Sequence, residues 1–264
     1  MIDIHNHLLI GVDDGPADEA ATYHLLLQAV DQGITDILIT PHHYSGDWRT
    51  PQDKVMTEIK RVESIIAEHQ LPVKVYPGQE IRINDKVIEE LASGYNMSLN
   101  GSRYVLIEFP FNDLPFYVDN LLYELQLKGY TPLIAHPERC KPIIKQPDKL
   151  FNLVEKGAIA QVTSSSVTGD LGDNLQETSL EMIRNHLVHI IGSDAHHHEV
   201  RPFKLAEAYQ VVEDQLGREY VDYLKFNSEA ILNNNDVRVK APRQMESHYT
   251  SNRKKTKKKF FGLF

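Results

Sequence analysis

Short apolar runs recur along the chain, and each is followed by polar residues and then by apolar positions at helical spacing. The runs span three to five residues, a length typical of buried strands. In order they are Ile2–Ile4, Ile37–Thr40, Val73–Tyr76, Tyr104–Ile107, Leu133–Ala135, Ala158–Val162 and His189–Gly192. Helical spacing appears in Leu25, Leu26, Ala29 and Val30 before Gly33, and in Val55–Ile66, Val87–Leu91, Leu121–Leu127, Leu150–Val154 and Leu180–Ile183. This alternation predicts parallel strands joined by crossover helices.

The number of these units favours a closed barrel over an open sheet. Seven strand-helix units are too many for one compact flavodoxin-like sheet, and closure gathers the carboxyl ends of all strands at one face. We therefore predict an α/β fold, a distorted seven-stranded (β/α)7 TIM-like barrel, over residues 1–240. Pro242 and the polar run Gln244–Asn252 predict that residues 241–264 form a linker and a tail.

Composition limits the class of protein further. A chain of 264 residues with 41% hydrophobic residues can bury a full core in one domain. The first residues include no basic segment before a long apolar stretch, and no run of about eighteen apolar residues occurs, so we expect neither a signal peptide nor a membrane span. The single cysteine, Cys140, excludes an internal disulfide and fits a reducing compartment. We expect a cytoplasmic protein.

Charge is unevenly distributed between the body of the chain and its C-terminal end. The net charge is -9, and the last twelve residues, Arg253–Phe264, carry six positive charges and no acid. Removing those six charges leaves -15, which would repel nucleic acid and counts against a nuclease. Charge runs of this kind favour a solvated, disordered tail. Because aromatic residues follow the basic run, peripheral contact with anionic lipid at the inner face of the cell membrane is the alternative.

Side chains that commonly bind metal ions follow the predicted strands. They are His5, His7, His42, Glu80, Glu108, His136, Asp194 and His196. Residues two apart in an extended segment point to the same side, so His5 and His7 can chelate one ion, and the last strand repeats this spacing. Glu80 and Glu108 end buried strands, where an acid needs a cation or hydrogen-bond donors to offset its desolvation. Together these side chains offer enough ligands for two or three ions.

In the turn after the first strand, two adjacent aspartates are candidates for a further metal ligand. Asp13 and Asp14 precede Gly15, and either aspartate could shape the turn and cap the following helix or bind metal. Mixed histidine and carboxylate ligands without a thiolate suit manganese, iron or zinc. A carboxylate that bridges two ions is typical of a two-metal hydrolase.

The positions of two arginines indicate the chemical class of the substrate. Arg139 lies three residues after His136 and Arg201 lies seven after Asp194, so both can bring a planar cationic group to the metal face and bind a phosphate ester. Surface ion pairing is the alternative for each. A thiol-dependent tyrosine phosphatase would need Cys-x5-Arg, but Gln146 stands where Cys140 requires the arginine. We therefore expect hydroxide to attack phosphorus directly, without a phosphocysteine.

These motifs resemble the polymerase-and-histidinol-phosphatase (PHP) superfamily over residues 1 to 235. The matching segments are His5-Asn6-His7, Thr40-Pro41-His42-His43, Pro77-Gly78-Gln79-Glu80, Ile107-Glu108-Phe109-Pro110, Ala135-His136-Pro137-Glu138-Arg139 and Ser193-Asp194-Ala195-His196. More closely, Gly78-Gln79-Glu80-Ile81-Arg82 and Glu108-Phe109-Pro110 are similar to the manganese-dependent protein-tyrosine phosphatases encoded in capsule and exopolysaccharide loci of Gram-positive bacteria, which counter a partner tyrosine kinase.

The resemblance implies a metal arrangement. One ion would be held by His5, His7, Glu80 and Asp194, a second by Glu80, Glu108 and His136, and a third by Asp14, His42 and His196. It also implies that Arg139 and Arg201 bind the phosphoryl group, that the fold is a distorted seven-stranded barrel, and that the chain forms homo-oligomers.

Three functions follow from the same residues. The first is a metal-dependent protein-tyrosine phosphatase that acts on a membrane-associated bacterial tyrosine kinase. The second is a phosphoesterase for small molecules, of the histidinol-phosphate type, or a nuclease, because fold and metal set do not fix the substrate. The third is a regulator that binds phosphotyrosine without catalysis, which the complete ligand set disfavours.

Overall fold

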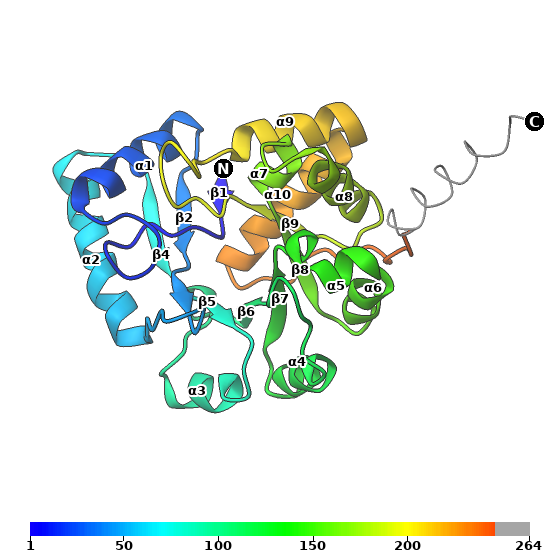
Figure 1. The fold of residues 1–264 in the computed structure, drawn as a ribbon. Helices are drawn as coiled ribbons and strands as arrows, with labels where there is room; N and C mark the ends of the chain where they lie inside the picture. The colour runs from blue at the N-terminus through cyan, green and yellow to red at the C-terminus, as the bar shows by residue number, and fades with distance from the viewer. Residues whose placement is uncertain (246–264) are drawn as a thin grey trace, which may run out of the picture.

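The structure, a computed structural model, describes residues 1–245, and strands and helices alternate along them (Figure 1). The strands are β1 (Ile2–Asp3), β2 (Asp36–Ile39), β3 (His42–His43), β4 (Lys74–Pro77), β5 (Glu80–Arg82), β6 (Tyr104–Glu108), β7 (Thr131–Ala135), β8 (Ile159–Thr163) and β9 (Ile190–Gly192). The helices are α1 (Glu19–Asp31), α2 (Gln52–Glu68), α3 (Val87–Ser93), α4 (Val118–Leu127), α5 (Lys141–Lys145), α6 (Asp148–Glu155), α7 (Ser164–Thr168), α8 (Asp173–Arg184), α9 (Leu205–Leu216) and α10 (Arg218–Leu232), with short 3-10 turns at Leu99–Gly101 and Pro137–Arg139.

Every strand predicted from the sequence is present, and two of them are interrupted. Thr40 and Pro41 separate β2 from β3, because proline has no N–H to donate to a neighbouring strand. Gly78 and Gln79 separate β4 from β5. A Cβ on Gly78 would lie 3.2 Å from the Ile39 carbonyl oxygen and 2.9 Å from Leu99 Cδ2, so a larger residue at this close crossing would force its neighbours to shift.

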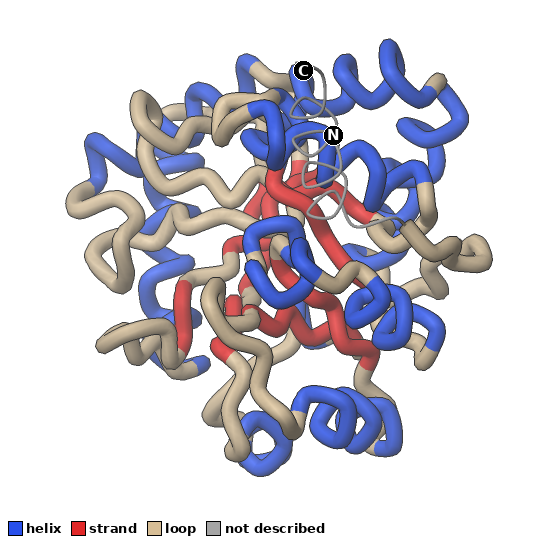
Figure 2. The backbone as a smooth tube through the Cα atoms, turned by 45° about the vertical axis from the view of Figure 1, so that its right-hand side comes forward, coloured by secondary structure: helices blue, strands red, loops and turns tan. Residues whose placement is uncertain are grey.

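The strands form a closed, curled sheet in which every ladder among the described residues is parallel. One sheet has the order β1-β2-β4 and the other β3-β5-β6-β7-β8-β9, and the interrupted strands carry the chain from the first sheet into the second. The remaining seam is closed by backbone hydrogen bonds from Asp194 N to His5 O (2.7 Å) and from His7 N to Ala195 O (2.8 Å). Figure 2 shows the strands at the centre with helices around them. This confirms the distorted seven-stranded barrel.

Side chains facing the barrel interior divide it into an apolar end and a polar end. Because alternate residues of a strand face the same side, the interior takes Leu106, Leu133, Ile159 and Ile190, which form one buried apolar cluster. Two residues further along three of these strands the inward positions are Glu108, Gln161 and Gly192. A Cβ on Gly192 would lie 2.7 Å from the Cβ of His5, so the last strand carries glycine where the polar side chains crowd together.

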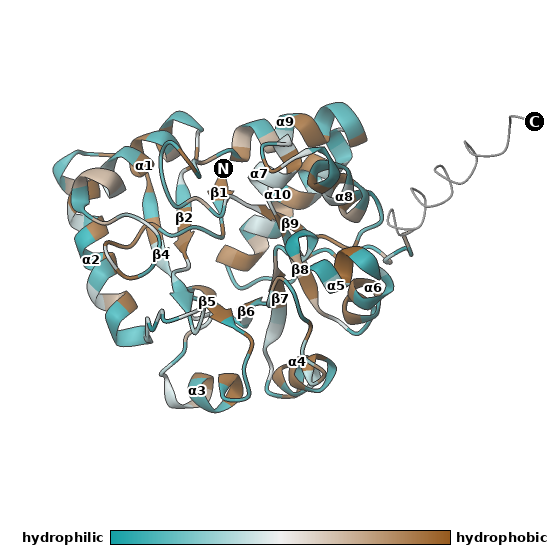
Figure 3. Cartoon of the chain, viewed as in Figure 1, coloured by the Kyte–Doolittle hydropathy of each residue, from teal (hydrophilic) through white to brown (hydrophobic). Residues whose placement is uncertain are grey.

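The helices bury one face against the outside of the strands. In α2 the apolar residues Val55, Ile59, Val62 and Ile65 recur at helical spacing and are buried, whereas the opposite side is polar (Figure 3). Helix α1 is capped at its N-terminus by Asp18, whose side chain accepts a hydrogen bond from Ala21 N (2.9 Å). In residues 1–245, no helix is both long and apolar enough to span a membrane. The predicted tail, Arg253–Phe264, lies outside the described residues.

Candidate metal centre and active site

All nine predicted metal ligands lie at the carboxyl end of the barrel strands, where the fold brings them together. Six of them follow or end a strand, His42 and Glu80 begin β3 and β5 directly after the breaks in the two interrupted strands, and Asp14 lies in the loop after β1. His136 and Asp194, directly or nearly after β7 and β9, have left-handed backbones with φ of 31° and 53°. Such conformations are costly for residues other than glycine and often occur at functional sites. Here they turn both side chains back over the end of the barrel.

Glu80 is the centre of the buried group. Its carboxylate lies 3.4 Å from His5 Nε2 and 3.6 Å from His7 Nε2. The same carboxylate lies 2.6 Å from His42 Nδ1 and 2.8 Å from His136 Nε2. Glu80 is fully buried at the start of β5, so four imidazoles surround one desolvated carboxylate. This arrangement suits a carboxylate that bridges two ions.

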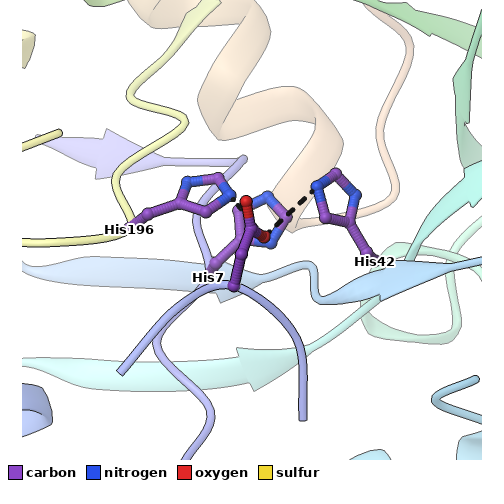
Figure 4. A group of neighbouring side chains, drawn as sticks. His7, His42 and His196 are labelled. Atoms are coloured by element: carbon purple, nitrogen blue, oxygen red, sulfur yellow. Dashed lines mark ion pairs between the residues drawn. The ribbon is translucent and has the colours of Figure 1, made fainter. Parts of the chain in front are cut away.

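Asp14 forms a second group at the rim of the buried cluster. Its Oδ1 lies 3.2 Å from His196 Nε2 and 3.5 Å from His42 Nε2. The ring of His7 stacks on that of His196 at 3.7 Å between centroids. Figure 4 shows the rings of His7, His42 and His196 side by side, and potential ligand atoms of these three histidines and of Asp14 lie within 4.8 Å of one another. The half-exposed Asp14 therefore connects the buried cluster with solvent.

Several buried nitrogen and oxygen atoms of the cluster lack hydrogen-bond partners, as is expected of metal ligands. Buried polar atoms normally have hydrogen-bond partners, and those that lack one point to an ion, a ligand or a water. Within residues 1–245 the atoms without a suitably oriented partner include Nε2 of His5, His7 and His196, Nδ1 of His42, and one carboxylate oxygen each of Glu80 and Glu108. Potential ligand atoms lie within 4.8 Å of one another in three overlapping sets: His5, His7 and Glu80; His42, Glu80 and Glu108; and His7, Asp14, His42 and His196. The residues present therefore fit divalent ions.

Neighbouring side chains orient the imidazoles. Asp13 Oδ2 lies 2.7 Å from His7 Nδ1, and Gln161 Oε1 lies 2.9 Å from His5 Nδ1. The carbonyl oxygen of Asp194 lies 2.9 Å from His196 Nδ1. Each contact engages Nδ1 and leaves Nε2 facing the cluster, as is typical of metal-binding histidines.

These contacts separate the roles of the two adjacent aspartates. Asp13 is buried, orients His7 and accepts a hydrogen bond from Gly15 N (3.0 Å), whereas Asp14 faces the cluster. The residue pattern alone left both roles open for both aspartates, whereas the family resemblance implied Asp14 as the metal ligand; Gln161 was not among the predicted site residues. A glutamine inside the apolar run Ala158–Val162 was the available signal, because its position faces the barrel interior.

Charge within the cluster changes the protonation of its members. Burial lowers the pKa of His5 and His42, but the Glu80 carboxylate outweighs burial and raises these pKa values to about 9 and about 10. Burial raises the pKa of Glu80, but the two imidazoles hold it well below its usual range. Burial lowers the pKa of His196 to about 4, so this imidazole is neutral at pH 7. Because metal ligation requires neutral imidazole, an ion bound by His5 and His42 would displace protons from them.

Three arginines line the mouth of the site. Arg139 and Arg201 both contact Asp194 Oδ2, at 2.7 and 2.8 Å, and Arg201 also lies 3.4 Å from Asp14. Their partners are carboxylates of the cluster, so neither arginine is an isolated surface ion-pair residue. Arg82, which the sequence analysis did not select for a role, lies 2.9 Å from Glu108. The guanidinium groups therefore form a positive rim over an acidic floor.

Two cavities open beside these arginines and share Arg139, Asp194 and Arg201. One, of about 250 Å³, is lined by the candidate ligands His42, Glu108 and His136 and by the aromatic residues Trp48 and Phe111. The other, of about 470 Å³, extends past Leu171, Val200 and Lys204. Neither is lined by Cys140, which is buried and whose pKa is raised by burial. This placement agrees with the expectation that no cysteine nucleophile acts here.

The barrel, the histidine-carboxylate cluster at its carboxyl end and the arginines over it define a metal-dependent hydrolase of TIM-like fold. The model of a family described as capsular polysaccharide synthesis, CpsB/CapC, matches residues 1–233, and the chain belongs to this family. This confirms the family expected from the motifs.

Two relatives named as tyrosine-protein phosphatases, one of them as putative, align with the chain over its full length. The chain is 40% identical over 264 residues to tyrosine-protein phosphatase YwqE of Bacillus subtilis (strain 168), with 100% of each chain covered. It is 41% identical over 267 residues to a putative tyrosine-protein phosphatase, CapC, of Staphylococcus aureus, again with 100% of each covered.

Solved structures agree with the fold. One, from work on YwqE of Bacillus subtilis and CpsB of Streptococcus pneumoniae as unique metal-dependent tyrosine phosphatases, has a TM-score of 0.91 at 41% identity and covers 93% of this chain and 100% of that chain. A probable 2-pyrone-4,6-dicarboxylic acid hydrolase of Acinetobacter baumannii shares the fold alone, with a TM-score of 0.53 at 15% identity, over 88% of this chain and 98% of the other.

Proposed function

We propose that the chain, a metal-dependent tyrosine-protein phosphatase of capsular polysaccharide synthesis, releases phosphate from a tyrosine-phosphorylated protein at the cluster around Glu80. The observation that carries the proposal is the convergence of Arg139 and Arg201 on Asp194 directly beside buried imidazole and carboxylate atoms without hydrogen-bond partners. A phosphoryl group needs cationic charge around its oxygens, and this is where the fold concentrates it.

The ions are proposed to be two or three Mn²⁺, with Fe or Zn as alternatives, because the donors are imidazole and carboxylate without thiolate. Their ligands would be His5, His7, Asp14, His42, Glu80, Glu108, His136, Asp194 and His196. Bound divalent ions supply Lewis-acid charge and acidify water at neutral pH. Asp13 and Gln161 hold two of the imidazoles in the tautomer that ligation requires.

The arginines bind and orient the substrate. Each planar guanidinium can donate two parallel hydrogen bonds to phosphoryl oxygens, and both groups are partly exposed toward the cavity. The hydrogen bonds that Arg139 and Arg201 now donate to Asp194 fix their direction before substrate arrives. Tyrosine leaves as phenolate, a comparatively good leaving group, which reduces the demand for a strong general acid.

A membrane-associated bacterial tyrosine kinase is the proposed partner, because capsule synthesis is the process of the family. The basic and aromatic run Arg253–Phe264 would attract the phosphatase to anionic lipid at the inner face of the membrane, where it meets the kinase. Deleting residues 253–264 should lower binding to anionic vesicles without changing turnover of a soluble phosphopeptide. Unchanged vesicle binding would remove this part of the proposal.

Phosphate release from a tyrosine-phosphorylated peptide tests the function itself. Protein stripped of metal should be inactive and should recover on addition of Mn²⁺. The variant C140S should recover equally, whereas H136A should not. Turnover of histidinol phosphate but not of phosphopeptide would favour the small-molecule phosphoesterase, and binding of the phosphopeptide without release would favour a regulator.

A further inference from the structure

The only tryptophan of the chain, Trp48, lies at the mouth of the proposed active site. Its loop is held in a tight turn: Tyr44 N donates to Trp48 O (3.0 Å) and Trp48 N donates to Ser45 O (3.0 Å). Arg82 donates to Ser45 Oγ (2.9 Å) and ties this loop to the arginine rim. Trp48 is nevertheless 39% exposed, so the residue is accessible to a ligand at the mouth of the cavity.

A second aromatic residue lines the same cavity. The ring of Phe111 lies 4.7 Å from the Arg139 guanidinium carbon and 5.6 Å from the His136 ring, measured to the Phe111 centroid. The cavity of about 250 Å³ is therefore lined by arginines, by candidate metal ligands and by two aromatic side chains. A dianionic phosphate attached to a flat ring matches both the charged and the aromatic part of this lining.

We propose that Trp48, together with Phe111, binds the phenyl ring of phosphotyrosine and makes the site selective for aryl phosphates. The inference rests on the proposed function and names the recognition element of that site. In phosphoserine a single carbon separates the phosphate oxygen from the backbone, so a phosphoserine with its phosphate at the arginines would leave the aromatic surfaces unfilled. Trp48 is thus a specificity residue for the ring, while the arginines recognise the phosphate.

The larger cavity is the competing place for the ring. Among the described residues its lining contains the aliphatic side chains Leu171 and Val200 and no aromatic one. It also contains fewer of the candidate metal ligands, since only Asp194 lines it. The aromatic cavity therefore fits the ring better, and the larger one offers space for the neighbouring peptide chain.

Kinetics of the full-length, manganese-loaded protein test the proposal. W48L should raise KM for free phosphotyrosine by about 3- to 10-fold, the value of one aromatic contact, and should leave inhibition by inorganic phosphate unchanged because phosphate has no ring. W48F keeps an aromatic ring, so its KM for phosphotyrosine should be much closer to the wild-type value than that of W48L. Y123L, which removes an exposed aromatic residue on α4 outside both cavities, is the matched control and should have no effect. L171A changes the lining of the larger, competing cavity, and it should not raise KM for phosphotyrosine as W48L does.

Binding without turnover gives an independent result. Because Trp48 is the only tryptophan, its fluorescence should change saturably on addition of a non-hydrolysable phosphonate analogue of phosphotyrosine, and not with methylphosphonate. Equal loss of affinity for phosphate and phosphotyrosine in W48L, or a KM increase in L171A but not in W48L, would overturn the proposal. If the wild type releases no phosphate, the proposed function fails, and the fluorescence titration still decides whether the ring binds at Trp48.

Discussion

Asp13→Asn should weaken metal binding without removing any proposed ligand. Asp13 Oδ2 accepts from His7 Nδ1 (2.7 Å) and from His42 N (2.9 Å), while Oδ1 accepts from Gly15 N (3.0 Å). An asparagine of the same shape keeps one oxygen, so its amide N–H₂ must face at least one of these buried donors. It also removes the negative charge that makes the His7 imidazole a better ligand.

The size of the effect follows from these contacts. Leaving one buried donor without an acceptor costs about 1 to 3 kcal/mol, which should appear as reduced stability of the metal-free protein. Loss of a residue that orients a ligand typically costs about 10- to 100-fold in metal affinity, or about 1.4 to 2.8 kcal/mol. We therefore expect the Mn²⁺ concentration for half-maximal phosphate release to rise by about 10- to 100-fold, with much of kcat recovered at saturating metal.

The assay is a titration with chelator-buffered Mn²⁺, followed by phosphate release and separately by calorimetry. Asp222→Asn is the control, because Asp222 is exposed on α10 and contacts Arg218 rather than the cluster. An unchanged half-maximal Mn²⁺ concentration in Asp13→Asn would refute the view that this carboxylate orients His7. A loss of kcat that excess metal does not restore would instead place Asp13 in the chemical step.

Three further predictions follow. Arg139→Lys keeps the charge but loses the planar pair of donors, so kcat/KM for phosphopeptide should fall by about 10- to 100-fold with unchanged metal affinity; equal activity would show that charge alone suffices. Metal binding at pH 7 should release protons, because the pKa values of His5 and His42 lie at about 9 and about 10, and affinity should increase with pH; calorimetry in buffers of different ionisation enthalpy measures both. Burial and the charge of His186 lower the pKa of fully buried His189 to about 4, below its unfolded value near 6.5, so its contribution is complete above pH 6.5 and is lost as pH falls toward 4. Over this range the free energy of unfolding, measured with urea, should fall by about 3 kcal/mol less in His189→Gln than in the wild type, and an identical slope in the variant would contradict the assignment.

Strand positions could be read from the sequence because each strand is a continuous apolar run, and the ligands could be found because they follow those runs. The breaks between β2 and β3 at Pro41 and between β4 and β5 at Gly78 could not be predicted from the sequence, because each depends on how neighbouring strands cross. Helices α9 and α10 also went unpredicted, because no strand follows them to mark a repeating unit.

Side-chain roles within the site were predictable only to the level of residue type. Asp13 and Asp14 are identical in chemistry and adjacent in one turn, and only their side-chain directions distinguish them. Gln161 contacts His5, and Trp48 lines a cavity with residues distant in sequence, so neither belongs to a local motif. The sequence therefore indicated the proposed metal ligands and the arginines proposed to bind phosphate, whereas the orienting residues and the proposed ring-binding residues required the three-dimensional arrangement.

The seam that closes the barrel has a consequence for folding. It joins the segment around His5 and His7 to the segment around Asp194, and its hydrogen bonds connect residues 188 to 190 positions apart in sequence, such as Ser193 with His5 and with Asp3. An ion shared by both segments would act as a reversible cross-link on nearly the whole chain, and closing so long a loop carries a large entropic cost. The same ion would then serve both catalysis and the stability of the fold. Metal depletion would therefore make the enzyme inactive and also more prone to unfolding and proteolysis.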